Sequence, residues 1–387
     1  MPTLTALSQA LAEARGRPEL LAPALIAWAE AAPIFRYRSP PVEEALVEAS
    51  RLLPPLAQPL LEGRCLLRLG EVKMQQGLLD QAAQLTELAA ARLGQGGGDD
   101  PALRAACLRT RILRRRGDTA ATEADRLLAE LSATALVLKQ KRAPSATYIA
   151  LTLAIADAEV ERLDEGGIDT LRGLLNLLDR HHVEAPDARL AAHQGIALLA
   201  QTSGRLDVAL IHLRAAVALV KPFAAPLDLL ECRLALGTAL SAARQHAEAR
   251  RVLQHVIDDA RDLGAEQHRL LGLTALSSVL AGQGAARGAV DIAIQSAVGY
   301  ARQGSLLGYV RGATLAAHAL IGSGRPVQAI ELLMYGVAAL RRTVGEPGAQ
   351  LLQLQLDAIA DELGEAEYER LCQELLQLRA ARKRLDA

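Results

Sequence analysis

The sequence predicts an all-α fold, a solenoid in which helical hairpins stack side by side. Four alanines, called the ladder alanines below, recur at every fortieth position: Ala209, Ala249, Ala289 and Ala329. Each follows by five positions a site typical of a turn, occupied by Gly204, Arg244, Gly284 and Gly324. A fixed period of this size is typical of repeat proteins built from pairs of helices. Composition agrees, because aromatic residues make up only 2% of the chain and the strong helix formers Ala and Leu supply most apolar side chains.

Length and charge narrow the class of protein further. A chain of 387 residues exceeds what one compact core usually organises, which fits a solenoid that grows by neighbour contacts. The net charge of −1 provides no bulk attraction to nucleic acid or to an anionic membrane. The sequence shows neither a membrane-spanning apolar run nor a signal peptide, and its four cysteines stand singly, as is typical of a reducing compartment. These absences lead us to expect a cytoplasmic protein, and the large excess of Arg over Lys is typical of a GC-rich bacterial genome.

Residues 1–60 do not follow the repeat. Prolines interrupt them at Pro33, Pro40, Pro41, Pro54 and Pro55. Because proline cannot continue a helix, the segment is divided into short helices. We therefore expect residues 1–60 to form an N-terminal helical cap.

Residues 61–185 are expected to hold irregular repeats of the same kind. Leu69-Gly70, Gly77 and Ala82 fit the template of the later repeats. The stretch from Ala82 to Ala209 leaves room for three units. Further turns are expected at Gly117 and within residues 165–167.

Two loops separate helices in this irregular region. One is GQGGGDDP at residues 94–101, where Asp100 is expected to cap the next helix and Pro101 to occupy its first turn. The other is RAPS at residues 142–145.

Residues 186–346 are expected to form four regular repeats. Twelve positions before each ladder alanine lies a small residue, namely Ala197, Gly237, Ser277 or Ala317. Four positions after it lies Leu213, Leu253 or Leu333, with Ala293 as the exception. Small residues let two helices cross closely, and the leucines fill the space beside the crossing. Residues 347–387 are expected to form C-terminal capping helices, because the charged segment 364–384 suits the polar outer face of a terminal repeat.

This pattern resembles the tetratricopeptide repeat (TPR) family. Leu236-Gly237 followed by Ala247-Glu248-Ala249 is the closest match to the family signature. The sequence departs from the family in using Leu where TPR repeats use aromatic residues, and its period exceeds the usual length of about 34 residues. Forty-residue repeats with an extended second helix are similar to the TPR superhelix of large bacterial regulators of the MalT type. The resemblance implies a right-handed α-solenoid of TPR-like hairpins, in which the first helix of each pair lines a concave groove.

No enzyme constellation is predicted. GQGGGDD lacks the Lys and the preceding strand of a phosphate-binding loop. His181 and His182, as neighbours in a helix, would point about 100° apart and cannot chelate one metal ion. The other histidines carry no metal-binding motif; they are His193, His212, His246, His255, His268 and His318. Ser277-Ser278 and Glu161 lack an organised catalytic partner, so we expect no catalytic residue, no metal and no cofactor.

The most charged feature is a stripe of arginines that leads to Gly117. Its members are Arg104, Arg109, Arg111, Arg114, Arg115 and Arg116. Such a stripe can hold RNA, an acidic partner or phosphate groups. The interpretation we favour is a helix C-terminus whose cations offset the helix dipole, since few aromatic residues are present to stack on bases. Nucleic acid is therefore not the expected partner.

The remaining candidate site is the groove. Ten side chains on first helices pack neither into a hairpin nor onto the next repeat in the alignment, and they are candidates for partner contact: Gln194, Gln201, Glu231, Thr238, Ser241, Thr274, Ser278, Arg311, Thr314 and His318. Only Arg311 among them is firmly basic and Asn is absent, which argues against a clamp for a terminal carboxylate. We interpret the chain as a non-catalytic scaffold or adaptor that binds a protein or peptide partner. Two alternatives stay open, a regulatory module that senses a ligand or peptide, and a self-assembling structural component.

Overall fold

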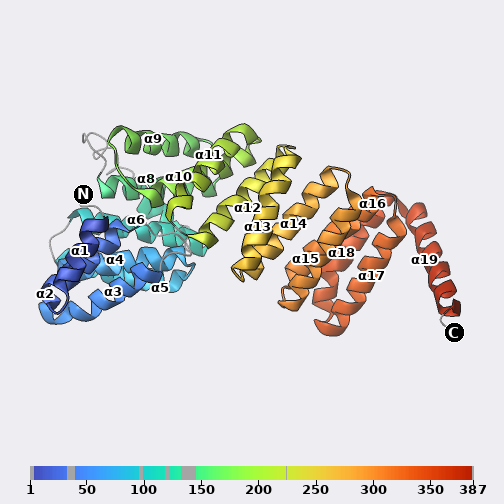
Figure 1. The fold of residues 1–387 in the computed structure, drawn as a ribbon, viewed down its shortest axis with the longest axis horizontal. Coiled ribbons are helices and arrows are strands. Elements are labelled where there is room, and N and C mark those ends of the chain that lie inside the picture. The colour runs from blue at the N-terminus through green and yellow to red at the C-terminus, as the bar shows by residue number, and fades with distance from the viewer. Residues whose placement is uncertain are drawn as a thin grey trace. The chain divides into compact units, whose positions relative to one another are not determined.

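The chain folds entirely into helices within the part that the structure describes. The structure is a computed structural model that describes residues 4–32, 40–95, 99–117, 122–131, 145–223 and 225–385. Within these ranges every regular element is an α-helix or a short 3-10 helix, which confirms the predicted all-α class (Figure 1). The chain forms two compact units, Met1–Leu229 and Leu230–Ala387. The four-part division at residues 60, 185 and 346 stays a prediction.

The first unit begins with short helices. They are α1 (Leu4–Ala14), α2 (Pro18–Ala31), α3 (Pro40–Leu52) and a 3-10 helix at Pro54–Leu56. Hairpins follow, made of α4 (Pro59–Gln75) with α5 (Leu79–Gln95), α6 (Asp99–Arg116) with the helical residues 122–131, α8 (Ala146–Glu161) with α9 (Gly166–Arg180), and α10 (Pro186–Thr202) with α11 (Leu206–Val220). Prolines at Pro18, Pro59 and Pro186 each begin a helix, where the missing N–H costs no hydrogen bond.

The two predicted loops of the irregular region fall partly outside the described residues. α6 begins at Asp99, so Asp100 lies inside the helix instead of capping it, and Pro101 does occupy the first turn. At the second break, Ser145 caps α8, because its Oγ accepts a hydrogen bond from the backbone N–H of Tyr148 at 3.1 Å. Residues 96–98 and 142–144 of the two loops lie outside the described residues.

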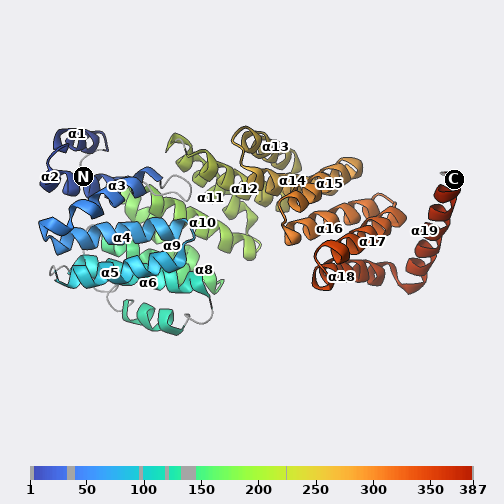
Figure 2. The ribbon, with the colours of Figure 1, turned by 90° about the horizontal axis from the view of Figure 1, so that it is seen from below.

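The second unit continues the hairpin pattern. Its helices are α12 (Pro226–Ala242, which begins at the end of the first unit), α13 (His246–Asp262), α14 (Glu266–Gly282), α15 (Ala286–Arg302), α16 (Leu306–Gly322), α17 (Pro326–Thr343), α18 (Glu346–Leu363) and α19 (Glu365–Leu385). Figure 2 shows α12 to α18, in the yellow to red part of the chain, as successive packed helices, with α19 standing at an angle to them at the C-terminal end.

The predicted packing positions form the inside of the hairpins. The four ladder alanines have no exposed surface, and the small residues twelve positions earlier are buried as well. A Cβ atom on Gly237 would lie 2.6 Å from the side chain of Leu253, so a larger residue there would require this leucine to shift. In the third repeat the hydroxyl of Ser277 donates to the carbonyl of ladder alanine Ala289 at 2.8 Å. The small-residue crossing predicted from the 40-residue period is therefore confirmed.

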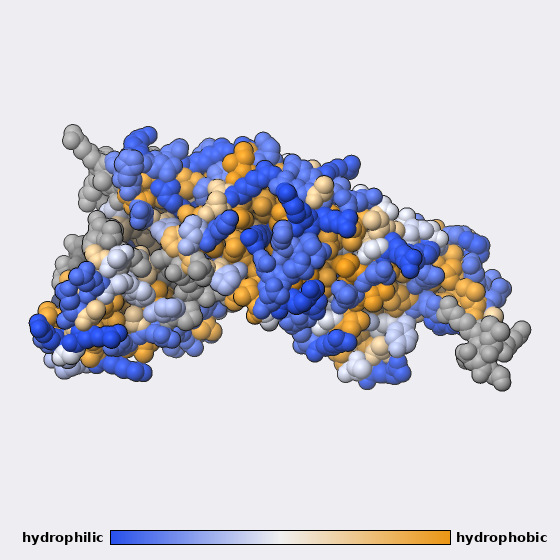
Figure 3. Space-filling view, viewed as in Figure 1, coloured by the Kyte–Doolittle hydropathy of each residue, from blue (hydrophilic) through white to orange (hydrophobic). Residues whose placement is uncertain are grey.

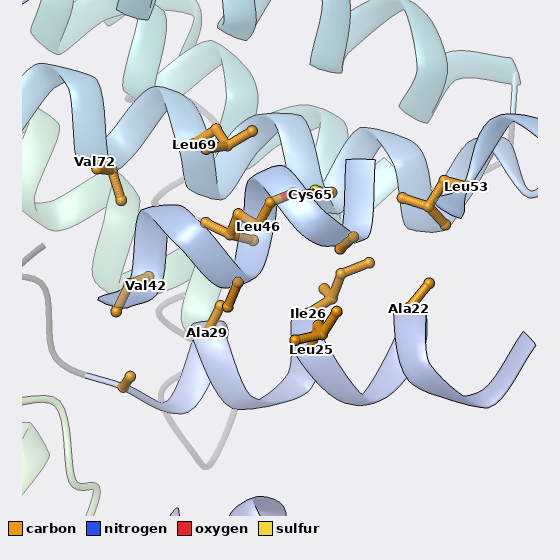
Figure 4. Close-up of a cluster of buried hydrophobic side chains, with 13 residues drawn as sticks. Ala22, Leu25, Ile26, Ala29, Val42, Leu46, Leu53, Cys65, Leu69 and Val72 are labelled. Atoms are coloured by element: carbon orange, nitrogen blue, oxygen red, sulfur yellow. Dashed lines mark hydrogen bonds between the residues drawn. The ribbon is translucent and has the colours of Figure 1, made fainter. Parts of the chain in front are cut away.

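The core at the start of the first unit joins three helices. Ala22, Ile26 and Ala29 of α2 pack against Leu46 of α3 and Leu69 of α4 in Figure 4. In the same cluster the thiol of Cys65 donates to the carbonyl oxygen of Leu46 at 3.3 Å. Burial raises the pKa of this thiol to about 12, which keeps it protonated and unreactive. Cys107 and Cys232 are also buried and free.

The predicted turn positions carry left-handed backbone. Gly204, Gly284 and Gly324 have φ of 73°, 73° and 72°, and Arg244 has φ of 56°. A left-handed conformation costs a side-chain-bearing residue about 1–2 kcal/mol, and glycine adopts it without that penalty. The second repeat is thus the one of the four that carries strain at its turn.

Arg244→Gly is expected to raise the free energy of unfolding by about 0.5–1 kcal/mol, because the relief of backbone strain exceeds the extra entropy that glycine adds to the unfolded chain. Urea denaturation followed by circular dichroism measures the change. The reciprocal variant Gly284→Arg is the control, expected to be destabilised. Equal stability of wild type and Arg244→Gly would show that the turn is not strained.

Candidate functional site

The ten predicted groove residues divide between the two units and between three degrees of exposure. Gln194 and Gln201 lie on α10 in the first unit, and the other eight lie in the second. Gln194, Thr238, Ser278, Arg311 and His318 are exposed, whereas Gln201, Glu231, Ser241 and Thr314 are half-buried. Thr274 alone of the ten is buried.

Thr274 is a packing residue, so its prediction as an available contact is wrong. Its side chain is 2% exposed, and its hydroxyl lies 2.8 Å from the carbonyl oxygen of Leu270 and 2.7 Å from the hydroxyl of Ser296 on α15. Ser296 is fully buried at the same contact. The two hydroxyls satisfy each other inside the hairpin, which is why a polar residue is tolerated there.

The exposed candidates of the second unit form a surface that we call the first-helix wall, defined by Thr238, Ser278, Arg311 and His318. Thr238, Ser278 and His318 occupy one repeat position on α12, α14 and α16 and are exposed in every case. Arg311 lies seven positions before His318, two turns along the same face of α16. On the visible side of this unit, Figure 3 shows polar residues interspersed with apolar ones.

The hydroxyls of the wall already donate to their own helices. Thr238 Oγ1 donates to the carbonyl oxygen of Ala235 at 2.8 Å, and Ser278 Oγ donates to that of Thr274 at 3.4 Å. A hydroxyl has one hydrogen and two lone pairs, so each oxygen stays able to accept a hydrogen bond from a partner. The guanidinium of Arg311 supplies donors on the same surface.

The predicted arginine stripe is neutralised within the first unit. Its members contact acidic or carbonyl oxygens as follows: Arg104 with Glu71, Arg109 with Glu123, Arg111 with Asp157, Arg114 with Asp125 and Glu161, Arg115 with the carbonyl of Met74, and Arg116 with Asp80. These side chains therefore do more than offset a helix dipole. They connect α6 to other helices, and a phosphate backbone would have to compete with the acidic partners.

Arg68 is the centre of a charged network that the sequence did not reveal. Its guanidinium donates to the carbonyls of Ala29 and Ala32 at 3.0 and 2.6 Å, and to Glu71 at 2.7 Å. It also lies 3.5 Å from Asp187 at the start of α10, three hairpins further along the chain. The network thus connects α2, α4 and α10 of the first unit.

The electrostatics of the network favour its charged state. Burial opposes ionisation of Glu71, but Arg68 and Arg104 outweigh burial and hold the pKa of this carboxyl below its usual value. Burial likewise works against the charge of Arg111, and Asp157 at 2.6 Å keeps the pKa of the guanidinium raised. Arg111 and Glu71 are therefore both charged at neutral pH.

The residues considered for catalysis and metal binding take part in an ion pair, a helix crossing and a helix end. Glu161 forms an ion pair with Arg114 at 2.8 Å, and Ser277 is buried at its helix crossing. α9 ends at Arg180, so His181 and His182 lie just beyond the helix instead of inside it, with His182 at φ of 51°. Among the described residues no group of three or more potential metal ligands lies together.

Within the described ranges, none of the helices has the length and apolar character needed to cross a lipid bilayer.

The structure brings together two histidines that stand apart in the sequence. His193 on α10 and His212 on α11 are hydrogen-bonded to each other.

Comparison with known proteins places the fold. No protein-family model matches the sequence, and no curated protein matches it. The signal transduction ATPase with numerous domains (STAND) that has a tetratricopeptide repeat sensor, from Pyrococcus horikoshii, is similar with a TM-score of 0.59 and 11% identity over 89% of this chain and 54% of that one. The chain thus spans about half the length of the STAND protein.

Two Rap proteins match over most of their own length. The apo form of RapI has a TM-score of 0.61 at 10% identity, covering 84% of this chain and 99% of that one. A Rap protein complexed with Competence and Sporulation Factor has a TM-score of 0.54 at 12% identity, covering 84% and 88%. At these identities the likeness concerns the fold, and it confirms a solenoid of TPR-like helical hairpins.

Proposed function

We propose that this chain is a non-catalytic interaction scaffold that binds an extended segment of a protein partner on the first-helix wall. The observation that carries the proposal is the exposure of one repeat position on three successive first helices. Thr238, Ser278 and His318 recur at the same spacing as the ladder alanines, yet they face solvent. A segment that crosses the repeats meets one of these side chains on each.

The chemistry of the wall suits the backbone of a peptide. The oxygens of Thr238 and Ser278 can accept from backbone N–H groups, and Arg311 can donate to carbonyl oxygens. These groups stand on helices whose packing is already fixed, so little entropy is lost when they bind. Side-chain pockets are not required for such backbone recognition.

The fold comparisons support a binding role. A Rap protein of similar fold is complexed with Competence and Sporulation Factor, and the STAND protein of similar fold has a sensor of the same repeat type. The same observation favours the second candidate function, a regulatory module that senses a ligand. Self-assembly is the third candidate, and mass measurement at several protein concentrations tests it.

Ser278→Arg combined with His318→Arg is expected to reduce capture of the partner from native lysate by about tenfold or more. Two bulky cations at the centre of a contact surface must be desolvated or displaced, and a tenfold loss corresponds to about 1.4 kcal/mol. Both positions are exposed, so the variant is expected to retain its helical circular dichroism. Quantitative pull-down with full-length bait measures the effect.

The matched control places the same charges on second helices. His255 on α13 and Gln295 on α15 are exposed and have the same separation as Ser278 and His318. His255→Arg with Gln295→Arg is expected to capture the partner as wild type does. If Ser278→Arg with His318→Arg captures as much partner as wild type, or if the control variant loses as much capture as this variant, binding does not use the first-helix wall.

A further inference from the structure

A small cavity lies in the first unit among α9, α10 and α11, whereas the first-helix wall belongs to the second unit. Its volume is about 310 Å³, at the lower end of the range of about 300–1,000 Å³ that is typical of small-molecule sites. The polar side chains that line it are Arg172, Asn176 and Asp179 of α9, Arg189 and His193 of α10, and His212 of α11. Three helices therefore contribute polar groups to one cavity.

Two histidines meet in this cavity. The Nδ1 atoms of His193 and His212 lie 2.9 Å apart, and the ring centroids are separated by 5.1 Å. At this distance one Nδ1 donates and the other accepts, so the two rings have different tautomers. The ring that accepts at Nδ1 carries its hydrogen on Nε2 when neutral, which makes that atom a donor.

The fold does not require histidines at these positions. The corresponding residues 40, 80 and 120 positions later are Arg233 and Val252, Leu273 and Ile292, and Ala313 and Leu332. Leu273 and Ala313 are buried in their own hairpins. Two of these three equivalent pairs are apolar, so the half-buried histidine pair needs another explanation than packing.

Among the other polar side chains that line the cavity, some have N–H groups available to bind a ligand. Arg189 forms an ion pair with Asp179 and donates to the carbonyl of Val183 at 3.3 Å. Arg172 and Asn176 form no hydrogen bond or ion pair within the described part of the chain. The charges of Arg189 and Asp179 cancel, so Arg172 gives the lining an excess positive charge.

We propose that this cavity binds the phosphate group of a small molecule through Arg172, Asn176 and the two histidines. Arginine recognises phosphate by charge-assisted hydrogen bonds, and donors from three helices suit a tetrahedral group better than the two oxygens of a planar carboxylate. The cavity shares no residue with the first-helix wall, so neither proposal depends on the other.

Protons are expected to bind together with phosphate. Burial first, then His212 and Arg189, lower the pKa of His193 to about 4, while Asp179 raises it. Burial and Arg172 lower the pKa of His212. A phosphate dianion beside the rings adds the negative charge that favours imidazolium, so the pKa values of the rings are expected to rise on binding and the histidines to take up protons. Calorimetry in two buffers of different ionisation enthalpy measures this uptake.

The direct test is titration of the full chain with inorganic phosphate at constant ionic strength. Nuclear magnetic resonance of labelled imidazole groups is expected to show saturable shifts for His193 and His212, and none for the exposed His255. Arg172→Gln is expected to weaken binding about tenfold or more, because it removes a hydrogen bond to a charged group. Acetate at the same concentration is expected to cause no saturable shift.

A variant that copies another repeat keeps the test independent of folding. His193→Leu with His212→Ile introduces the pair found at Leu273 and Ile292, and is expected to retain wild-type circular dichroism while calorimetry detects no phosphate binding. Saturation by acetate equal to that by phosphate, a response to Zn²⁺ in place of phosphate, an unchanged affinity of Arg172→Gln, or no saturable shift at all would each overturn the proposal.

Discussion

Arg68→Met is expected to lower the free energy of unfolding of the first unit by about 3 kcal/mol. Removing one partner from a buried ion pair typically costs about 3–5 kcal/mol, because the remaining charge stays buried, and Arg68 with 11% side-chain exposure belongs at the lower end of that range. Methionine retains the apolar stem, so the loss reports the missing contacts with Glu71, Asp187 and two carbonyl groups.

The single tryptophan of the chain makes this measurement specific. Trp28 lies on α2 and packs against the core cluster of α2, α3 and α4, next to Ala29, whose carbonyl accepts from Arg68. Denaturant unfolding followed by Trp28 fluorescence therefore reports the first unit. The control is Arg92→Met, which removes a more exposed ion pair with Glu62 in the same unit and is expected to cost less than about 1 kcal/mol.

The effect of Arg68→Met is expected to depend on pH. Because the pKa of Glu71 is lowered in the folded protein, its ionised form stabilises the fold above the usual carboxyl pKa of 4.5, and this contribution is lost as pH falls through the lowered value. The difference between wild type and variant should therefore narrow below pH 4.5. A difference that is small at pH 7, or constant down to acid pH, would contradict the role of the network.

Gly312→Ala is expected to destabilise the second unit by about 2 kcal/mol, within the usual cost of overpacking, although alanine is the better helix former. A Cβ atom on Gly312 would lie 2.8 Å from the backbone N and 2.9 Å from the Cα of Ala297, so α15 and α16 must move apart. Overpacking of this kind costs about 1–3 kcal/mol, and the contact is with backbone that cannot rotate away.

The matched control for Gly312→Ala lies on the same helix. Gly322, the exposed last residue of α16, has no neighbour within 4 Å of a built Cβ atom, so Gly322→Ala is expected to stabilise slightly, by less than about 0.5 kcal/mol. Urea denaturation followed by circular dichroism compares the two variants. Changes of the same sign would show that the crossing of α15 and α16 tolerates a methyl group.

The repeat period predicted the hairpins because packing obeys local spacing. The ladder alanines, the crossing residues and the left-handed turns all follow from helix geometry, and the structure confirms them. Thr274 escaped the prediction because its burial depends on Ser296 across the hairpin. Its equivalent Gln194 is exposed and Thr314 is half-buried, and among the residues equivalent to Ser296 only Ser296 carries a hydroxyl. The sequence signal of this burial was Ser296, a polar residue at a packing position.

The charged network and the histidine pair differ in how far the sequence could reveal them. Arg68 and Asp187 lie three hairpins apart in the chain, and no repeat rule pairs a residue of one hairpin with a hairpin that distant. His193 and His212 belong to one hairpin, and in the 40-residue register they are equivalent to Leu273 and Ile292. The 40-residue register was therefore the signal from which the contact between the two histidines could have been predicted.

The ion pair of Arg68 with Asp187 also has a consequence for how the first unit comes apart. In a solenoid whose repeats contact only their neighbours, stability is a sum along one dimension, and unfolding can start at an end and advance hairpin by hairpin. A bond from α4 to α10 closes a loop that encloses the hairpins between them. Loss of any one of these hairpins opens that loop, so we expect the hairpins from α4 to α10 to unfold together instead of one by one.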